Sequence, residues 1–218
     1  VCCDVMHQQH TVWATEGLPQ LKARRTKSLR VFADQQDNIW LYGQGTLYMY
    51  NKNSDQWDTT IGSSLGLTGY GVDRNVNGMA GDRSGNIWVG SDQLGLLKMN
   101  LNTHIVESVQ PRNINVNPSN IDKVSIQSVY VDDTDLLWVG TEKSGVAFCG
   151  EYIYRFGARH IGDVTAITQD ANGKIWYGTS DKGVIGYDGN LASLKVSCLA
   201  TTPDGSLWIG SKRNGLTS

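Results

Sequence analysis

The stretch "SGNIWVGSDQLGLLKMN", residues 84–100, has the pattern of two short strands joined by turns. Its first strand nevertheless contains three consecutive apolar residues, Ile87, Trp88 and Val89. A sheet with one face in water should alternate apolar and polar residues along each strand. Both faces of this strand must therefore be covered by other parts of the protein.

The same phrase occurs five times, as "DNIWLYG", "GNIWVGS", "LLWVGT", "GKIWYGT" and "SLWIGS", around Trp40, Trp88, Trp138, Trp176 and Trp208. Four copies have an Asp six positions before the tryptophan, namely Asp34, Asp82, Asp132 and Asp170, and the fifth has Thr202. An apolar residue stands nine positions before every tryptophan: Val31, Met79, Val129, Ile167 and Leu199. The intervals of 48, 50, 38 and 32 residues fit a propeller blade with variable linkers.

The repeats predict an all-β fold, a β-propeller built of four-stranded antiparallel blades. The predicted units span approximately residues 28–60, 76–109, 126–157, 164–194 and 196–218, after a leader at 1–27 that could supply a closing strand. The last unit ends as its third strand should begin, so we expect an incomplete ring or fragment with four full blades and part of a fifth. A closed five-bladed ring is the alternative. No long window has helical periodicity.

The repeated tryptophans are predicted to be structural, because one position shared by every blade cannot form one site. Each indole should fill the space between neighbouring sheets. Small residues stand ten positions before four of the tryptophans, which suits a crowded innermost strand: Gly78, Ser128, Ala166 and Cys198. Cys149 and Cys198 are expected to be free and buried on inner or middle strands. Cys2 and Cys3 are adjacent, and no C-x-x-C spacing indicates a zinc site.

The repeats resemble the two-component regulator propeller family, from "DRSGNIWVGSDQLGL" to the less complete "DDTDLLWVGTEKSGV", "DANGKIWYGTSDKGV" and "PDGSLWIGSKRNGL". The leading "TVWATEGLPQ" also resembles the segment that opens such arrays, so the resemblance covers roughly residues 11–218. It implies the periplasmic sensor region of a bacterial hybrid histidine kinase, which binds a carbohydrate fragment and passes the signal through the membrane. The sequence itself has no kinase block, receiver domain or transmembrane helix.

Composition limits the partners. A formal net charge of −2 offers no general attraction for nucleic acid, and no segment is suited to membrane insertion. One basic run stands out, formed by Lys22, Arg24, Arg25, Lys27 and Arg30. Charge runs are usually solvated surface, and the alternative is a contact for an acidic or sulfated sugar. The expected partners are an oligosaccharide and either the remaining blades or another copy of the chain.

The residues offer little catalytic or metal chemistry. His7, His10, His104 and His160 are scattered, and no cofactor is predicted. The run "DDTD" at 132–135 is the best calcium candidate, but it lacks the spacing of a calcium loop. An Asp whose side chain bonds turn amides explains the repeated position without metal. We therefore predict no metal site and no catalytic residue.

Binding residues are expected where the units differ, in the linkers that enter each innermost strand. These linkers supply amides, charged groups and an aromatic ring suited to a sugar, namely Tyr70, Asp73, Arg74, Arg112, Asn113, Asn115, Asn120, Lys123, Arg159, His160 and Asp163. A non-enzymatic ligand-sensing module is the favoured function.

Two other functions remain open. The "DGSLWIG" phrase also resembles propeller lyases of the streptogramin-inactivating kind, in which His160 and Asp163 would transfer protons. Those lyases favour an aromatic and an acidic residue after the tryptophan, which this chain lacks. A purely architectural interaction domain is the third function.

Overall fold

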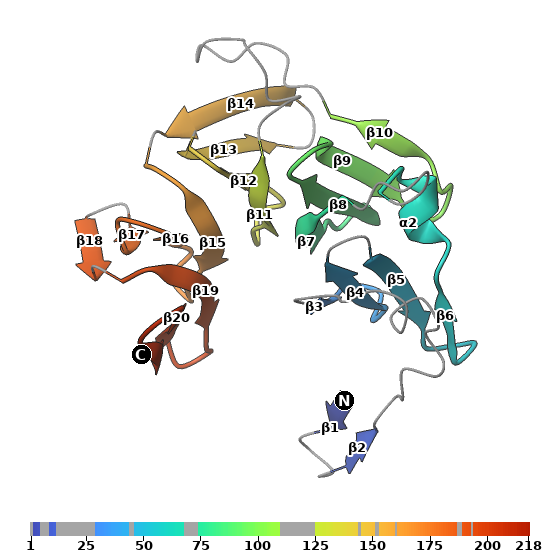
Figure 1. The fold of residues 1–218 in the computed structure, drawn as a ribbon, viewed down its shortest axis with the longest axis horizontal. Helices are drawn as coiled ribbons and strands as arrows, with labels where there is room; N and C mark the ends of the chain where they lie inside the picture. The colour runs from blue at the N-terminus through green and yellow to red at the C-terminus, as the bar shows by residue number, and fades with distance from the viewer. Residues whose placement is uncertain are drawn as a thin grey trace.

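The chain folds into five small antiparallel sheets arranged as a fan, with a separate hairpin near the N-terminus (Figure 1). The computed structural model describes residues 2–4, 9–11, 29–43, 46–67, 74–109, 125–143, 145–150, 153–159, 161–186, 189–192 and 194–218. This architecture confirms the predicted all-β propeller fold. Among the described residues, no helix has the length and apolar character needed to cross a membrane.

The first two sheets have four strands each. The first sheet contains β3 (Leu29–Ala33), β4 (Ile39–Gly43), β5 (Thr46–Asn51) and β6 (Gln56–Asp58). A single helical turn, α2 (Ile61–Ser64), follows it and packs against β5. The second sheet contains β7 (Val76–Gly81), β8 (Asn86–Ser91), β9 (Gly95–Asn100) and β10 (Val106–Ser108).

The other three sheets repeat this order. The third contains β11 (Ile126–Val131), β12 (Leu137–Thr141), β13 (Gly145–Gly150) and β14 (Ile153–Arg159). The fourth contains β15 (Val164–Gln169), β16 (Ile175–Thr179), β17 (Val184–Gly186) and β18 (Gly189–Ala192). In the fifth, the described strands are β19 (Val196–Thr201), β20 (Leu207–Ser211) and β21 (Gly215–Thr217).

The first strands of the sheets line the inside of the fan (Figure 1). β7 packs beside β11, β11 beside β15, and β15 beside β19. The fourth strands β10, β14 and β18 lie on the outside (Figure 1). Near the N-terminus, β1 (Cys2–Asp4) pairs with β2 (Gln9–Thr11), and residues 12–27 of the predicted leader lie outside the described residues.

Each repeated Asp holds both its turn and the repeated tryptophan. In four sheets the indole Nε1 donates to the Asp Oδ2, over 2.9 Å for Asp34–Trp40, 2.8 Å for Asp82–Trp88, 2.8 Å for Asp132–Trp138 and 2.9 Å for Asp170–Trp176. The other oxygen, Oδ1, accepts backbone amides of the turn between the first and second strands. The predicted bond to turn amides is confirmed, and the indole bond explains why Asp and Trp stand six residues apart.

The indoles pack between sheets where a following sheet is present. Trp40 and Trp88 are 0% and 4% exposed, and Trp138 and Trp176 are partly buried against the third and fourth interfaces. Trp208 is 38% exposed, because no described sheet follows the fifth one. The prediction that every indole fills a space between sheets is therefore wrong for Trp208. For the same reason Cys198 on β19 is a free but exposed thiol, not the buried one we expected.

Small residues let neighbouring inner strands approach closely. The residue two positions after the tryptophan pairs across to the residue ten positions before it, in the pairs Gly78–Gly90, Ser128–Gly140, Ala166–Gly178 and Cys198–Gly210. A Cβ on Gly78 would lie 2.6 Å from the Val129 amide nitrogen and 2.9 Å from the Ser128 Cα. Real Cβ atoms do not approach backbone so closely, so β7 and β11 need a glycine here.

The first sheet departs from this rule. Its equivalent pair is Arg30 and Tyr42. Tyr42 is buried among residues of the second sheet, including Val76 and Met79, and the Arg30 guanidinium donates to the backbone oxygen of Asn77. Burial raises the pKa of the Tyr42 phenol, and the adjacent Arg30 cation offsets part of that rise. The first strand of the second sheet, β7, packs against β4, which is the second strand of the first sheet. In the later sheets, the first strand of each sheet packs against the first strand of the next.

Candidate functional site

Most of the predicted binding residues lie outside the part of the chain that the structure describes. Those residues are Tyr70, Asp73, Arg112, Asn113, Asn115, Asn120, Lys123 and His160, and of Arg159 only the backbone, at the end of β14, is described. Arg74 and Asp163 are the two predicted residues whose side chains can be placed. They precede different sheets, the second and the fourth.

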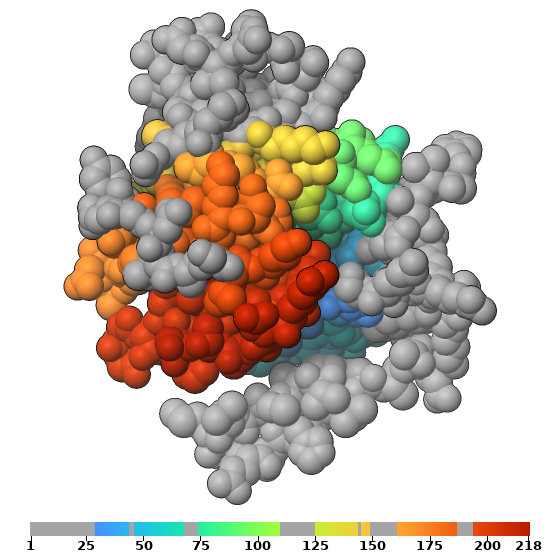
Figure 2. Space-filling model, turned by 60° about the vertical axis from the view of Figure 1, so that its left-hand side comes forward, coloured from blue at the N-terminus to red at the C-terminus, as the bar shows by residue number. Residues whose placement is uncertain are grey.

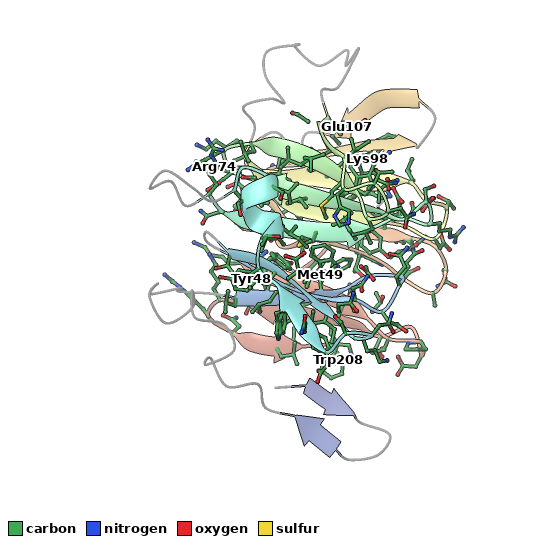
Figure 3. All side chains as sticks on the ribbon, turned by 90° about the vertical axis from the view of Figure 1, so that its right-hand side faces the viewer. Tyr48, Met49, Arg74, Lys98, Glu107 and Trp208 are labelled. Atoms are coloured by element: carbon green, nitrogen blue, oxygen red, sulfur yellow. The ribbon has the colours of Figure 1, made fainter. Side chains whose placement is uncertain are left out.

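Both of these side chains take part in local structure. Arg74 lies next to α2 (Figure 3), and its Nη1 donates to the backbone oxygen of Gly66 over 2.6 Å. Asp163 Oδ1 accepts the Lys143 amide over 2.7 Å, and Oδ2 accepts the Ser180 hydroxyl over 3.3 Å. Asp163 thus joins the turns of the third and fourth sheets. A role as proton carrier beside His160 would have to compete with these bonds.

The acidic run at 132–135 joins neighbouring sheets. Asp133 exchanges two hydrogen bonds with Gln169 of the fourth sheet, at 3.0 and 2.8 Å. Arg83 of the second sheet donates through Nη2 to the Asp133 backbone oxygen over 2.6 Å, and its amide donates to Asp135 Oδ1 over 3.2 Å. These hydrogen bonds connect residues 133 and 135 to the neighbouring sheets, so the acidic run has a structural role. Within the described residues no group of three or more His, Cys, Asp or Glu side chains could hold a metal ion.

Hydrogen bonds keep the buried Asp132 carboxylate ionised. Burial alone would raise its pKa, but bonds from the Trp138 indole, the Thr134 hydroxyl and turn amides outweigh it and hold the pKa below its ordinary value. For Asp170, the bond from the Trp176 indole is the largest cause of a pKa that is also lowered. A carboxyl with a lowered folded-state pKa stabilises the fold above its unfolded pKa of about 4, and this stabilisation is lost as pH falls through the folded-state pKa.

Replacing Trp138 by Phe should therefore raise the pKa of Asp132, because one strong donor is removed. We expect the carboxyl signal of Asp132, followed by carbon-detected NMR, to titrate at higher pH in the variant than in the natural chain. The free energy of unfolding of the variant should also fall less between pH 5 and pH 2. An unchanged Asp132 titration would mean that the indole bond does not set this pKa, and Asp170 serves as the internal control that should not move.

A groove of about 680 Å³ lies between the first and second sheets. The first sheet and the segment after it contribute Gln36, Asn38, Met49, Asn51, Ser54, Gln56, Trp57, Asp58, Thr59, Thr60 and Ile61, and the second sheet contributes Met99, Leu101, Asn102 and His104. Figure 3 shows Met49 between the first sheet, in blue, and the second sheet, in green.

The groove combines an apolar floor with planar amides. Met49 and Leu101 belong to the apolar cluster that joins the two sheets. The side-chain amides of Gln36, Gln56 and Asn102 also line the groove. Trp57 lies beside Tyr50, with ring centroids 5.3 Å apart. Such a surface can hydrogen-bond a polar ligand from two sides and stack against it.

The groove has few charged or titratable side chains, and one of them, Asp58, already accepts local hydrogen bonds. Asp58 Oδ1 accepts the Thr60 amide over 2.8 Å and the Thr60 hydroxyl over 2.7 Å. His104 is an exposed residue with a positive φ of 55° in the turn between β9 and β10. The groove therefore offers more hydrogen-bonding groups than formal charges, which favours an uncharged polar ligand over an ionic one.

Sequence reasoning missed this groove. The polar stretch "KNSDQWDTT", residues 52–60, has the composition of a solvated outer strand, so its amide and tryptophan side chains do not stand out as a binding surface. The usable signal is that the first unit has Tyr42 two positions after its tryptophan, where all four later units have a glycine on their second strand. The tyrosine in place of a glycine marks the contact between the first and second sheets as different from the other contacts between described sheets.

Comparison with known proteins identifies the repeats. Residues 70–93, 161–181 and 190–213 match the family described as Two component regulator propeller. The expected resemblance is thereby confirmed. A search of curated proteins found no match.

Solved structures share the fold. The extracellular domain of a B. thetaiotaomicron protein described as a hybrid two component system is 19% identical, with a TM-score of 0.69, over 87% of this chain and 26% of that one. The β-propeller domain of Cps50 (Swd1) from Myceliophteria thermophila is 11% identical, with a TM-score of 0.56, over 86% of this chain and 62% of that one. The chain thus spans about a quarter of the length of the first of these structures.

Proposed function

We propose that this chain is part of the extracellular, periplasmic sensor region of a two-component system, and that it binds an oligosaccharide without changing it. The groove between the first and second sheets is the observation that carries the proposal. The repeat family and the extracellular relatives with the same fold support the sensor role.

The chemistry of the groove favours a neutral sugar. Side-chain amides both donate and accept hydrogen bonds, as sugar hydroxyls do, and an aromatic ring beside an apolar floor suits the face of a pyranose. A sulfated sugar would need free cations. Arg30 is the one member of the basic run that the structure describes, and its guanidinium is engaged by Tyr42 and by the Asn77 backbone.

The position of the groove gives it a means of signalling. A ligand that contacts both sheets binds most tightly at one angle between them, and a ligand shifts an equilibrium only through such unequal binding. The first and second sheets meet through Arg30 and Tyr42, where the later sheets have small residues, so the contact that the ligand would bias differs from the other contacts between sheets.

Amide substitutions on the two walls of the groove test the proposal. Gln36→Ala on the first sheet and Asn102→Ala on the second should each weaken binding of a neutral oligosaccharide about tenfold, because each removes one or two hydrogen bonds. Isothermal titration calorimetry across a panel of neutral and sulfated oligosaccharides measures the effect. Lys212→Ala, an exposed change on the fifth sheet, is the matched control and should bind like the natural chain. Binding that neither amide variant weakens would place the ligand elsewhere.

A further inference from the structure

Two turns of the same kind line the groove, residues 52–55 after Asn51 and residues 101–104 after Asn100. In each turn the asparagine Oδ1 accepts the backbone amides two and three residues later, at 2.9 and 3.2 Å for Asn51 and at 3.0 Å in both bonds of Asn100. The fourth residue after each asparagine has a positive φ, 53° for Asp55 and 55° for His104. The two turns therefore share one hydrogen-bonding pattern and one backbone feature.

Asn100 also joins its turn to the interior of the second sheet. Its Nδ2 donates to Asn86 Oδ1 over 3.0 Å, and Asn86 Nδ2 donates to both oxygens of Asp82, over 3.1 and 2.9 Å. Asp82 also accepts the Trp88 indole over 2.8 Å. Asp82 and Asn86 are 5% and 4% exposed. A continuous series of hydrogen bonds therefore runs from Trp88 to the groove, and we call Asp82, Asn86 and Asn100 the amide network.

The direction of these bonds is fixed at both ends. A carboxylate accepts hydrogen bonds and has none to donate, so Asn86 must turn its NH2 group to Asp82 and its oxygen to Asn100. Asn100 must then offer its NH2 group to Asn86, which leaves its oxygen for the amides of Asn102 and Thr103 and for the Thr103 hydroxyl. A buried polar network whose members are satisfied is rigid, so it can hold the turn in one orientation.

The two sheets that form the groove share a residue that the other units lack. The repeated tryptophan is preceded, two positions earlier, by Asn38 in the first sheet and by Asn86 in the second. Asn38 Nδ2 donates to Asp34 Oδ2 over 2.9 Å, as Asn86 does to Asp82. The later units have other residues at this position, namely Leu136, Lys174 and Ser206. The asparagine therefore accompanies the groove and not the repeat as a whole.

We propose that Asn86 and Asn100 are positioning residues of the groove, which hold the turn 101–104 in the orientation in which Asn102 meets a ligand. The same network ties the turn to Trp88, which packs in one cluster with Ile126 of the third sheet. Figure 2 shows the second sheet, in green, beside the third, in yellow. The binding part of this inference rests on the proposed function, whereas the fixed orientation of the turn is a property of the protein without ligand.

Asn100→Asp separates the two contacts of this side chain. The new carboxylate can still accept the turn amides but has no donor for Asn86. In NMR spectra without ligand, the Trp88 indole N–H signal should shift, and the order parameters of residues 101–104 should fall. The Trp138 indole signal and the turn 52–55 are internal controls that should not change. Asn100→Ser, whose hydroxyl can cap the turn without added charge, should give the same changes. Circular dichroism shows that the variants are folded.

Binding tests whether Asn100 acts through its turn. The probe is the neutral oligosaccharide of the calorimetric panel that the natural chain binds most tightly. Asn100→Asp should weaken its binding about tenfold. The double variant Asn100→Asp/Asn102→Ala should bind about as weakly as Asn102→Ala alone, not about a hundredfold more weakly than the natural chain. Asn172→Asp makes the same substitution in an exposed turn of the fourth sheet and should bind like the natural chain.

Two results would overturn the proposal. An unmoved Trp88 signal with unchanged order parameters would show that the network does not hold the turn. Additive losses in the double variant would show that Asn100 affects binding independently of Asn102. If the natural chain bound no member of the panel, the proposed function would fail, and the NMR comparison without ligand would still support or refute the fixed orientation of the turn.

Discussion

Replacing Trp88 by Ala is expected to lower the free energy of unfolding by about 3 to 5 kcal/mol, as for other fully buried aromatic residues. The side chain is 4% exposed and packs between the second and third sheets, next to Ile126 and Val129. Its Nε1 donates to Asp82, a buried carboxylate that also accepts bonds from the Asn86 amide and side chain. The loss thus combines a cavity with a weakened carboxylate site.

Trp208→Ala is the matched control, because it removes the same residue from the same repeat position. Its cost should be about 1 kcal/mol, since more than a third of the side chain is already in solvent. Trp88→Phe keeps most of the packing and removes the indole donor, so it should fall between the two. Urea denaturation at neutral pH measures all three. Equal losses for Trp88→Ala and Trp208→Ala would show that the indoles do not act as packing between sheets.

The second large effect is expected for Gly78→Ala, which should destabilise the fold by about 2 to 3 kcal/mol. The added methyl would meet the backbone of Ser128 and Val129, at 2.9 and 2.6 Å, and backbone atoms cannot turn aside as a side chain can. β7 and β11 would have to separate. The sequence repeat alone would suggest that an alanine is tolerated in place of Gly78, because the fourth sheet has Ala166 at the equivalent position.

Gly210→Ala is the control, because it adds the same methyl group to the equivalent strand pair of the fifth sheet, Cys198–Gly210. Its Cβ would meet the Cys198 thiol, a side chain on the open face of the fifth sheet that has room to move. We therefore expect Gly210→Ala to lower the free energy of unfolding by less than about 1 kcal/mol. Thermal unfolding monitored by circular dichroism measures this loss. If Gly78→Ala proved as mild as this control, the close approach of β7 and β11 would not be a constraint on the fold.

The fold could be predicted from the sequence because its information is local and repeated. The apolar run around each tryptophan, the apolar residue nine positions earlier and, in four copies, the Asp six positions earlier recur with constant spacing, so each copy supports the others. The indole bond to Asp34 or Asp82 could not be predicted, since it depends on side-chain directions that spacing leaves open. Nor could the exposure of Trp208 and Cys198, which depends on whether a neighbouring sheet is present.

The candidate site was harder to predict because it does not repeat. Linker residues were chosen for their chemistry, yet Arg74 and Asp163 are engaged in holding their own loops and turns. The groove forms from side chains of two sheets, such as Gln36 and Asn102, which lie far apart in the sequence. Only the packing of one sheet on the next brings them together.

The Tyr42 side chain also bears on how the chain avoids folding into a wrong order. Arrays of similar units risk exchanging neighbours during assembly. If the first sheet took the place of the second beside the third, Tyr42 would occupy the position of Gly90, where even a Cβ would collide with Ile126 and Val129. The Tyr42 side chain therefore fits only where the first sheet meets the second. A misordered assembly would be opposed by a steric clash as soon as the wrong sheets packed together.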